Sequence, residues 1–207
     1  MLVVHHLNDS RSQRILWLLE ELGVPYEVKH YQRDAVTRLA PPELRAVHPL
    51  GKSPVITDGA VTLIESGAIV DYIVRRHGGG RLQPDSATPA YDKYVEWLHY
   101  AEGSAMLPLM LALYTGGLGE ATAPLRPRIE SETALHLGYV DAALAGRDFL
   151  LGDELSAADV QMSFVGEIAS VRQQGYRNIG AWVARFQARP AYKAALVKGG
   201  PYGFARS

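Results

Sequence analysis

The hydrophobic positions at the start of the chain follow a strand pattern and then a helix pattern. Leu2–Leu7 is a short run that opens with apolar residues and has the length of a strand. From Ile15 to Leu22 the apolar residues recur at i, i+3, i+4 and i+7, which predicts an amphipathic helix. Gly23 and Pro25 follow where a glycine and a proline commonly end a helix. We therefore expect a strand, a helix and a sharp stop.

The next segment predicts a second strand, a hairpin and another helix. Residues 26–31 alternate as a strand does, and residues 33–47 are polar and contain proline, which favours a loop with a short helix near 42–46. Two apolar runs, 55–57 and 61–64, are separated by Asp-Gly-Ala, a strong hairpin signal. The apolar stripe over residues 66–77 predicts a helix, and three consecutive glycines end it.

Beyond residue 80 the pattern becomes helical. Residues 81–88 contain proline and small polar residues, and we expect them to form a linker. Helical spacing then predicts helices over 89–114, 124–144, from 156 onward, 178–187 and 191–196, with a glycine-rich break at 115–123. The prediction is an α/β unit over residues 1–80 followed by an all-helical domain over residues 89–207.

Composition narrows the functions that this fold can have. The 207 residues contain 21 Lys and Arg against 22 Asp and Glu, which argues against a nucleic-acid partner held by bulk charge. There is no cysteine, so any thiol chemistry needs a thiol from a ligand. The seven histidines show no metal-ligand spacing, so no metal is expected. Without a secretion signal, and without an apolar run near the ~20 residues of a membrane span, we expect a cytoplasmic protein and no membrane partner.

A polar turn joins the first predicted strand to the first helix and admits two interpretations. Ser10 and Gln13 have the spacing of a capping box, so Ser10 could simply cap the helix. Alternatively, hydroxyls, a guanidinium and the free N–H groups of a helix start stabilise an anion here. The residues available for that purpose are Asn8, Ser10, Arg11 and Ser12.

Four motifs follow one another along the chain. They read SRSQR at 10–14, HPLGKSPV at 48–55, ESGAI at 65–69 and FLLGDELSAAD at 149–159. In this order and at this spacing they resemble the cytosolic glutathione transferases over essentially the whole chain. Residues 33–54 most resemble the fungal and bacterial subgroup typified by a yeast glutathione transferase.

This resemblance implies a thioredoxin-like N-terminal domain, a helical-bundle C-terminal domain and a homodimer. It also implies an enzyme that takes glutathione as co-substrate and adds the glutathione thiolate to a small hydrophobic electrophile, without a metal. Two other functions stay open on the same scaffold. One is a glutathione-dependent peroxidase or disulfide reductase, and the other is a non-catalytic module that binds glutathione or a protein partner.

The resemblance places the glutathione contacts in the N-terminal domain. Glu65 is expected to pair with the γ-glutamyl ammonium, and Ser66 to donate to the carboxylate together with the helix N-terminus. In the family the bond between Ser53 and Pro54 is cis, and the main chain of Ser53 pairs with the cysteinyl backbone. Lys52 either reaches the glycyl carboxylate or stays solvated. Taken singly, each motif could be an ordinary helix start or turn.

For the thiol itself the resemblance favours Ser10. In serine-type classes the thiol-facing serine lies four residues before an arginine, which is the spacing within SRSQR. Arg11 would add positive potential. Ser12 is the second candidate, and Asn8 could donate its amide instead. A tyrosine-type mechanism is excluded, because residues 5–7 are His, His and Leu.

Overall fold

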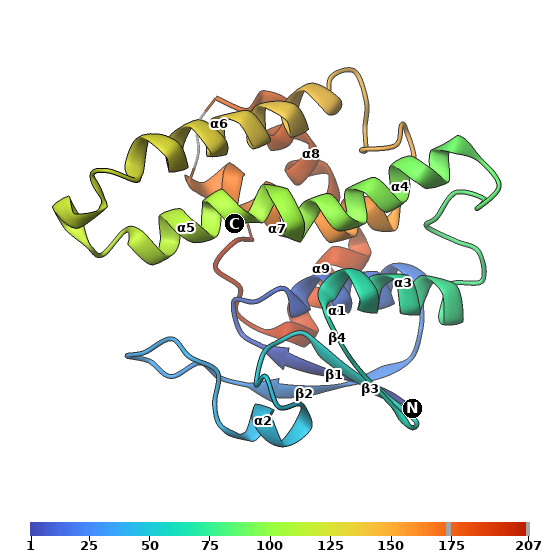
Figure 1. Ribbon diagram of the computed structural model, residues 1–207. Coiled ribbons are helices and arrows are strands. Elements are labelled where there is room, and N and C mark those ends of the chain that lie inside the picture. Colours follow the sequence, from blue (N-terminus) through green and yellow to red (C-terminus); the bar gives the residue numbers. More distant parts are fainter. Residues whose placement is uncertain (173–174, 206–207) are drawn as a thin grey trace. The chain divides into compact units, whose positions relative to one another are not determined.

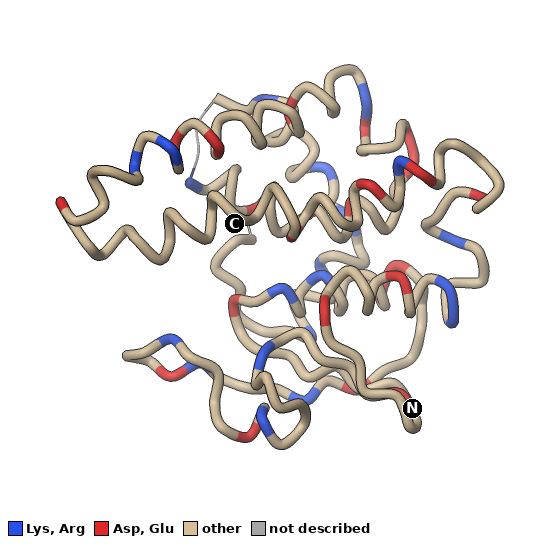
Figure 2. Tube along the Cα trace, in the orientation of Figure 1, with Lys and Arg blue, Asp and Glu red and all other residues tan. Residues whose placement is uncertain are grey.

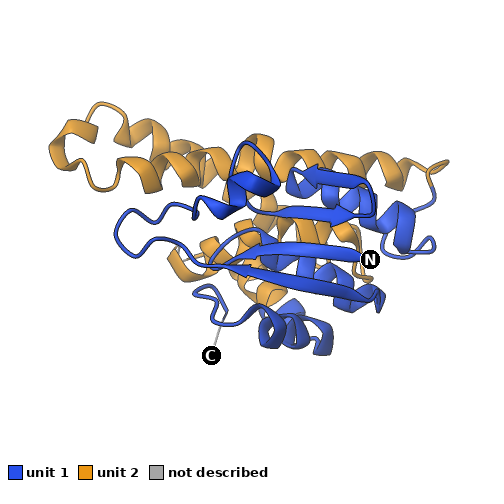
Figure 3. Ribbon diagram, turned by 90° about the horizontal axis from the view of Figure 1, so that it is seen from below, with its two compact units in different colours: residues 1–85, 184–207 blue, residues 86–183 orange. Residues whose placement is uncertain are grey.

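The computed structural model describes residues 1–172 and 175–205, which divide into two compact units. Unit 1 comprises residues 1–85 and 184–207, and unit 2 comprises residues 86–183 (Figure 3). Among the described residues, no helix is long and apolar enough to cross a membrane.

Unit 1 is built around a four-stranded mixed sheet (Figure 1). Its strands are β1 (Leu2–Leu7), β2 (Tyr26–Tyr31), β3 (Val55–Asp58) and β4 (Val61–Ile64), in the spatial order β2-β1-β3-β4. β1 pairs in parallel with β2 and antiparallel with β3, and β3 pairs antiparallel with β4. Gly59 lies in the turn between β3 and β4 with φ +58°, as the Asp-Gly signal predicts.

The helices of unit 1 also lie where the apolar spacing predicts them. They are α1 (Ser12–Leu22), α2 (Glu43–Val47), α3 (Ser66–His77) and α9 (Pro190–Gly199). α1 packs against β1, α3 and α9, and its apolar stripe is fully buried. Gly23 ends α1 in the left-handed conformation, with φ +61°, which a residue without Cβ adopts freely.

The end of the chain belongs to unit 1 because α9 and the residue before it contact α1. Arg189 donates to both carboxylate oxygens of Glu21, at 2.5 and 2.9 Å, and Lys198 lies 2.5 Å from a Glu20 oxygen. The indole of Trp17 stacks on Phe186. The sequence-based division assigned residues 184–207 to the helical domain. The contacts group them with the sheet instead, because the partners of α9 are on α1.

Unit 2 is helical, as predicted. Its elements are α4 (Pro89–Tyr100), α5 (Met106–Thr115), α6 (Arg126–Ala143), α7 (Ala157–Arg172) and the first part of α8 (Arg177–Gln187). The helix predicted over 89–114 contains a π-helical segment, Ala101–Ala105, between α4 and α5. The glycine-rich break holds a short 3-10 turn, Gly119–Thr122. The thioredoxin-like sheet domain and the helical domain expected from the motifs are therefore both present.

The buried carboxylate of Asp159 organises the start of α7. It accepts hydrogen bonds from the N–H of Leu150 at 2.8 Å, the N–H of Ser156 at 3.0 Å and the indole of Trp182 at 3.1 Å. The Ser156 hydroxyl also donates to it, at 2.8 Å. At the start of α7 the Ser156 hydroxyl therefore donates to the Asp159 carboxylate. In a capping box the serine hydroxyl instead accepts from a backbone N–H. Burial raises the pKa of Asp159, and these four donors oppose that shift.

Candidate functional site

The polar turn between β1 and α1 is a buried hydroxyl network. Ser10 is 3% exposed, and its hydroxyl oxygen accepts the N–H of Ser12 at 3.2 Å. The N-cap residue of α1 is Arg11, which makes no side-chain cap bond, so the predicted capping box of Ser10 and Gln13 is wrong. The Gln13 amide has no partner among the described residues and lies against Gly199. Ser10 therefore does not cap α1 in the way its spacing suggested.

Ser12 is fully buried and joins three parts of this turn. Its hydroxyl oxygen lies 2.7 Å from that of Ser10 and 2.9 Å from Nδ1 of His6, and it accepts the N–H of Leu7 at 3.3 Å. A further contact, also of 3.3 Å, runs from its hydroxyl to the Leu7 carbonyl. Ser12 has no exposed surface, whereas Ser10 keeps a small exposed fraction, 3%.

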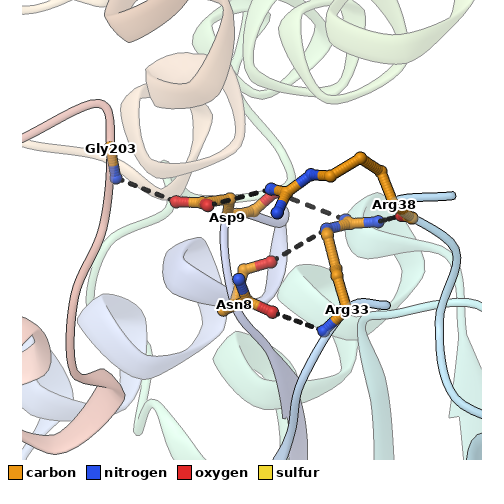
Figure 4. Close-up of polar contacts among 5 residues, drawn as sticks. All are labelled: Asn8, Asp9, Arg33, Arg38 and Gly203. Atoms are coloured by element: carbon orange, nitrogen blue, oxygen red, sulfur yellow. Dashed lines mark hydrogen bonds and ion pairs between the residues drawn. The ribbon is translucent and has the colours of Figure 1, made fainter. Parts of the chain in front are cut away.

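Asn8, the remaining candidate for the thiol, faces the loop that follows β2 (Figure 4). Its Oδ1 accepts the N–H of Arg33 at 2.8 Å, and the Arg33 guanidinium donates to the carbonyl of Asn8 at 3.0 Å. Asp9 is fixed in the same cluster, since it accepts from Arg38 at 3.3 Å and from the N–H of Gly203 at 2.9 Å. These contacts fix the turn to the loop after β2 and to Gly203. They leave the side-chain amide N–H groups of Asn8 as the donors that Asn8 can offer to a ligand.

The cis bond expected before β3 is present between Ser53 and Pro54. The Ser53 hydroxyl donates to the carbonyl of His5 at 3.1 Å and lies 3.4 Å from the Ser10 hydroxyl oxygen. The structure therefore brings Ser53 and Ser10, which are far apart in the sequence, to one place. Lys52 is exposed beside them.

The start of α3 has the features of an anion site. Glu65 is exposed and has φ +66° and ψ +114°, a conformation that costs a non-glycine residue roughly 1–3 kcal/mol. Ser66 is buried, and its hydroxyl oxygen accepts a hydrogen bond from Nη1 of Arg14 at 3.1 Å. The acceptor side of this hydroxyl is thus used by an arginine. The first N–H groups of a helix add further donors.

Sequence reasoning missed two side chains of this site. Arg14 is only 1% exposed and brings a positive charge behind Ser66, yet the sequence suggested it only through its spacing from Ser10. Its position directly before the apolar run of α1 was the available sequence signal, because that part of the helix is expected to be buried. His6 was considered only as a possible metal ligand, and alternation along β1 alone gives no information about its partner in the turn.

Burial dominates the electrostatics of the two histidines on β1. It lowers the pKa of His6 to about 4, assisted by the nearby His30 and opposed by a hydrogen bond to the main chain of Gly199 and by Asp9. Burial, with Lys29, also lowers the pKa of His5. Among the described residues, no group of three or more His, Asp or Glu side chains is placed to hold a metal ion.

Two of the cavities formed by the described residues lie in unit 2. One, of about 280 Å³, lies between α5 and α7 and is lined by Leu109, Ala112, Leu113, Gly116, Ile168 and Arg172. The other, of about 430 Å³, lies between α4 and α6, next to the stacked rings of Trp97 and Tyr139. The first is mainly apolar, since α5 carries no charged residue (Figure 2).

Comparison with known proteins agrees with this geometry. Sequence models of the glutathione S-transferase N-terminal and C-terminal domains match residues 1–75 and 104–190. Glutathione S-transferase 3 of Schizosaccharomyces pombe is 37% identical over 96% of this chain and 88% of its own length. Glutathione S-transferase 1 of Saccharomyces cerevisiae is 29% identical over 94% of each chain.

Solved structures give the same result. A glutathione S-transferase from Actinobacillus pleuropneumoniae superposes with a TM-score of 0.90 at 34% identity, covering 100% of this chain and 97% of that one. A glutathione transferase from Burkholderia graminis, with two glutathione molecules bound per subunit, has a TM-score of 0.79 at 26% identity and covers 94% and 87%. The resemblance inferred from the four motifs is confirmed, and the chain belongs to the glutathione S-transferase family.

Proposed function

We propose that this protein binds glutathione in unit 1 and transfers its thiolate to small hydrophobic electrophiles. The observation that carries the proposal is the grouping of Ser10 with Ser53, whose hydroxyl oxygens lie 3.4 Å apart, in the unit that also contains the α3 start. The strained, exposed Glu65 supports it further, because such strain persists mainly where function requires it.

The γ-glutamyl end of glutathione binds at the start of α3. Its carboxylate accepts from the Ser66 hydroxyl and from the first N–H groups of the helix, and Arg14 behind Ser66 adds positive charge. Glu65 accepts from the ammonium. The main chain of Ser53 pairs with the cysteinyl part of the peptide, as an added strand would. Lys52, which is exposed, takes the glycyl carboxylate.

The thiol is then activated at the start of α1. A free thiol of this kind titrates near ~8.5, so only a small fraction is thiolate at neutral pH. The Ser10 hydroxyl donates to the sulfur, and the Arg11 guanidinium and the N-terminus of α1 favour its negative charge. Each unit by which the thiol pKa falls corresponds to about 1.36 kcal/mol. The thiolate attacks an electrophilic carbon of the second substrate, forms the C–S bond and displaces a leaving group or adds across a double bond.

A panel of small electrophiles with and without glutathione tests this proposal. We expect turnover that requires glutathione, saturates with it and falls strongly in Ser10→Ala. The apolar cavity beside α5 supports the hydrophobic class of electrophile. No turnover with any electrophile, although calorimetry shows that glutathione is bound, would contradict the transferase assignment.

A second candidate activity is the reduction of small disulfides or peroxides. It is favoured by the Burkholderia graminis relative, which holds two glutathione molecules per subunit. Because this chain has no cysteine, the second thiol would have to come from a second glutathione. Adding a mixed disulfide and a peroxide to the panel separates the two activities, and binding without turnover of any substrate would leave a non-catalytic module.

A homodimer and a cytoplasmic location complete the proposal. The dimer is expected from the family, and it would cover large apolar side chains that are exposed on α5 and α6. They are Leu107, Leu113, Tyr114, Leu135 and Tyr139. We expect sedimentation at micromolar concentration to give twice the chain mass, and a 22.6 kDa species alone would contradict the dimer.

A further inference from the structure

Arg33 ties the polar turn between β1 and α1 to the loop after β2, and no step of the proposed function uses it. Its side chain is half-buried, and its guanidinium donates to three main-chain carbonyls (Figure 4). They are the carbonyls of Asn8 at 3.0 Å, Asp9 at 3.3 Å and Arg38 at 3.0 Å. Because Asn8 and Asp9 directly precede Ser10, one guanidinium holds both peptide groups that lead into the start of α1.

The loop that carries the third carbonyl is closed on itself and gives the guanidinium a fixed base. The Asp34 N–H donates to the carbonyl of Leu39 at 2.9 Å, and the Arg38 N–H donates to the carbonyl of Asp34 at 3.0 Å. The Asp34 carboxylate also accepts the N–H groups of Val36 and Thr37, at 3.0 and 2.6 Å. Since these bonds brace the loop from within, the guanidinium lies between two ordered segments.

The carbonyl bonds decide where the neighbouring N–H groups point. Among the described residues the only cis peptide bond is that between Ser53 and Pro54, and in a trans peptide the C=O and the N–H point in opposite directions. The N–H groups of Asp9 and Ser10 therefore point away from Arg33, which binds the carbonyls of the same two peptide groups. Neither N–H has a hydrogen-bond partner in the described part of the chain, although Ser10 is only 3% exposed.

An unpaired main-chain N–H in a buried residue is rare, and two successive N–H groups on one side of a turn suit an anion. In the proposed function the cysteinyl part of glutathione lies along Ser53, whose hydroxyl oxygen is 3.4 Å from that of Ser10. We propose that the N–H of Ser10, with that of Asp9 beside it, donates to the glutathione thiolate, and that Arg33 is the positioning residue that turns these N–H groups to the sulfur. The inference deepens the proposed function and rests on it.

The N–H of Ser10 adds to the hydroxyl of the same residue. The hydroxyl also has Ser12 and Ser53 as partners, at 2.7 and 3.4 Å, whereas the direction of the N–H is fixed by the peptide plane. A donor that is already in place loses little freedom when the sulfur arrives. Because Ser10→Ala keeps the N–H, the two donors can be tested separately.

The positive charge of Arg33 offers a competing explanation, since any cation near the turn favours a thiolate. Arg33→Lys keeps the charge but loses the planar fork that reaches three carbonyls, and Arg33→Gln loses both. Arg38→Gln is the matched control. It removes a charge from the same cluster, while the main-chain carbonyl of Arg38 and the two carbonyls before Ser10 keep their bonds to Arg33.

The experiment is a titration of thiolate absorbance against pH at saturating glutathione. We expect Arg33→Lys and Arg33→Gln to raise the apparent pKa of the bound thiol to a similar extent, by about half a unit or more. Arg38→Gln should leave this pKa close to that of the wild type. The double variant of Ser10→Ala with Arg33→Lys should have a higher thiol pKa than Ser10→Ala alone, because it weakens a second donor.

A wild-type thiol pKa in Arg33→Lys would overturn the inference, and so would a shift in Arg38→Gln as large as that in Arg33→Gln. A lower melting temperature of the Arg33 variants without a shift of the thiol pKa would show that Arg33 only stabilises the fold.

If the Arg33 variants do not fold, ¹H–¹⁵N NMR of the wild-type protein decides the point. The amide proton of Ser10 should move downfield as bound glutathione ionises, and it should not titrate in this way with S-methylglutathione, which has no thiol. A Ser10 amide that does not follow the ionisation of the bound thiol would overturn the proposal. Failure of the wild type to bind glutathione would instead refute the proposed function and, with it, this role of Arg33.

Discussion

Two helix starts in unit 1 place their donors differently. At the start of α1 the hydroxyls of Ser10 and Ser12 are buried. They are bonded to each other, and the Ser10 hydroxyl also accepts a backbone N–H of the same turn. At the start of α3 the exposed Glu65 is held in a strained conformation, and the Ser66 hydroxyl accepts a hydrogen bond from Arg14. An exposed, strained start suits binding, whereas a buried, ordered one suits fine control of a single proton.

The largest effect should come from the buried side of the α1 start. The pKa of His6 is about 4 in the folded protein and near 6.5 when unfolded, so the unfolded chain binds the proton more tightly. Stability is therefore lost as the pH falls from about 6.5 to about 4, by up to ~3 kcal/mol at about 1.36 kcal/mol per unit. Urea unfolding at a series of pH values should show a flatter profile in His6→Leu. Parallel profiles for the wild type and His6→Leu would mean that His6 is more accessible to solvent than the structure shows.

The second effect concerns affinity at the α3 start. Glu65→Ala should weaken glutathione binding by ~2 kcal/mol or more, about 30-fold in Kd, because the ligand ammonium loses its charged partner. Calorimetry measures this directly. Glu27→Ala, which removes an exposed glutamate on β2, is the control and should leave the affinity unchanged. If both variants bind like the wild type, Glu65 has no role in binding.

The third effect concerns the thiol. Ser10→Ala should raise the apparent pKa of bound glutathione by about one unit, because a hydroxyl donor to the thiolate is lost. Ser12→Ala should shift it less, since Ser12 is fully buried and acts only through Ser10. The pH dependence of turnover reports both shifts. A larger shift in Ser12→Ala than in Ser10→Ala would reverse the roles of the two serines.

The smallest effect separates strain from binding at Glu65. Glycine adopts φ +66° without the strain of roughly 1–3 kcal/mol but loses more entropy on folding, so Glu65→Gly should stabilise the protein by about 1 kcal/mol. It should also lose glutathione affinity as Glu65→Ala does. Thermal unfolding of the two variants makes the comparison, and equal melting temperatures would show that the backbone at Glu65 is not strained.

The apolar pattern predicted the strands and helices of unit 1 because burial on one face sets their spacing. It could not assign α9 to unit 1, since the ion pairs of Arg189 with Glu21 and of Lys198 with Glu20 join residues that are far apart in the sequence. The π-helical segment at Ala101–Ala105 lies within a continuous helical pattern and leaves no mark in spacing.

The site was predicted in its parts but not in its connections. Motifs indicated Ser53, Glu65 and Ser66, because a proline and a helix start have local signatures. The capping box at Ser10 does not form, because the Ser10 hydroxyl bonds locally to Ser12 and the Gln13 amide lies against Gly199 without a hydrogen-bond partner among the described residues. The approach of Gln13 to Gly199 joins distant parts of the sequence and is visible only once the chain is folded.

Calorimetry of glutathione binding over a range of pH tests the division between the two helix starts most directly, because it yields affinity and thiol pKa from one data set. We expect Glu65→Ala to lower the affinity and to leave the thiol pKa in place. We expect Ser10→Ala to raise the thiol pKa and to leave binding of the protonated thiol almost unchanged. A shift of the same quantity in both variants would contradict separate roles for the two helix starts.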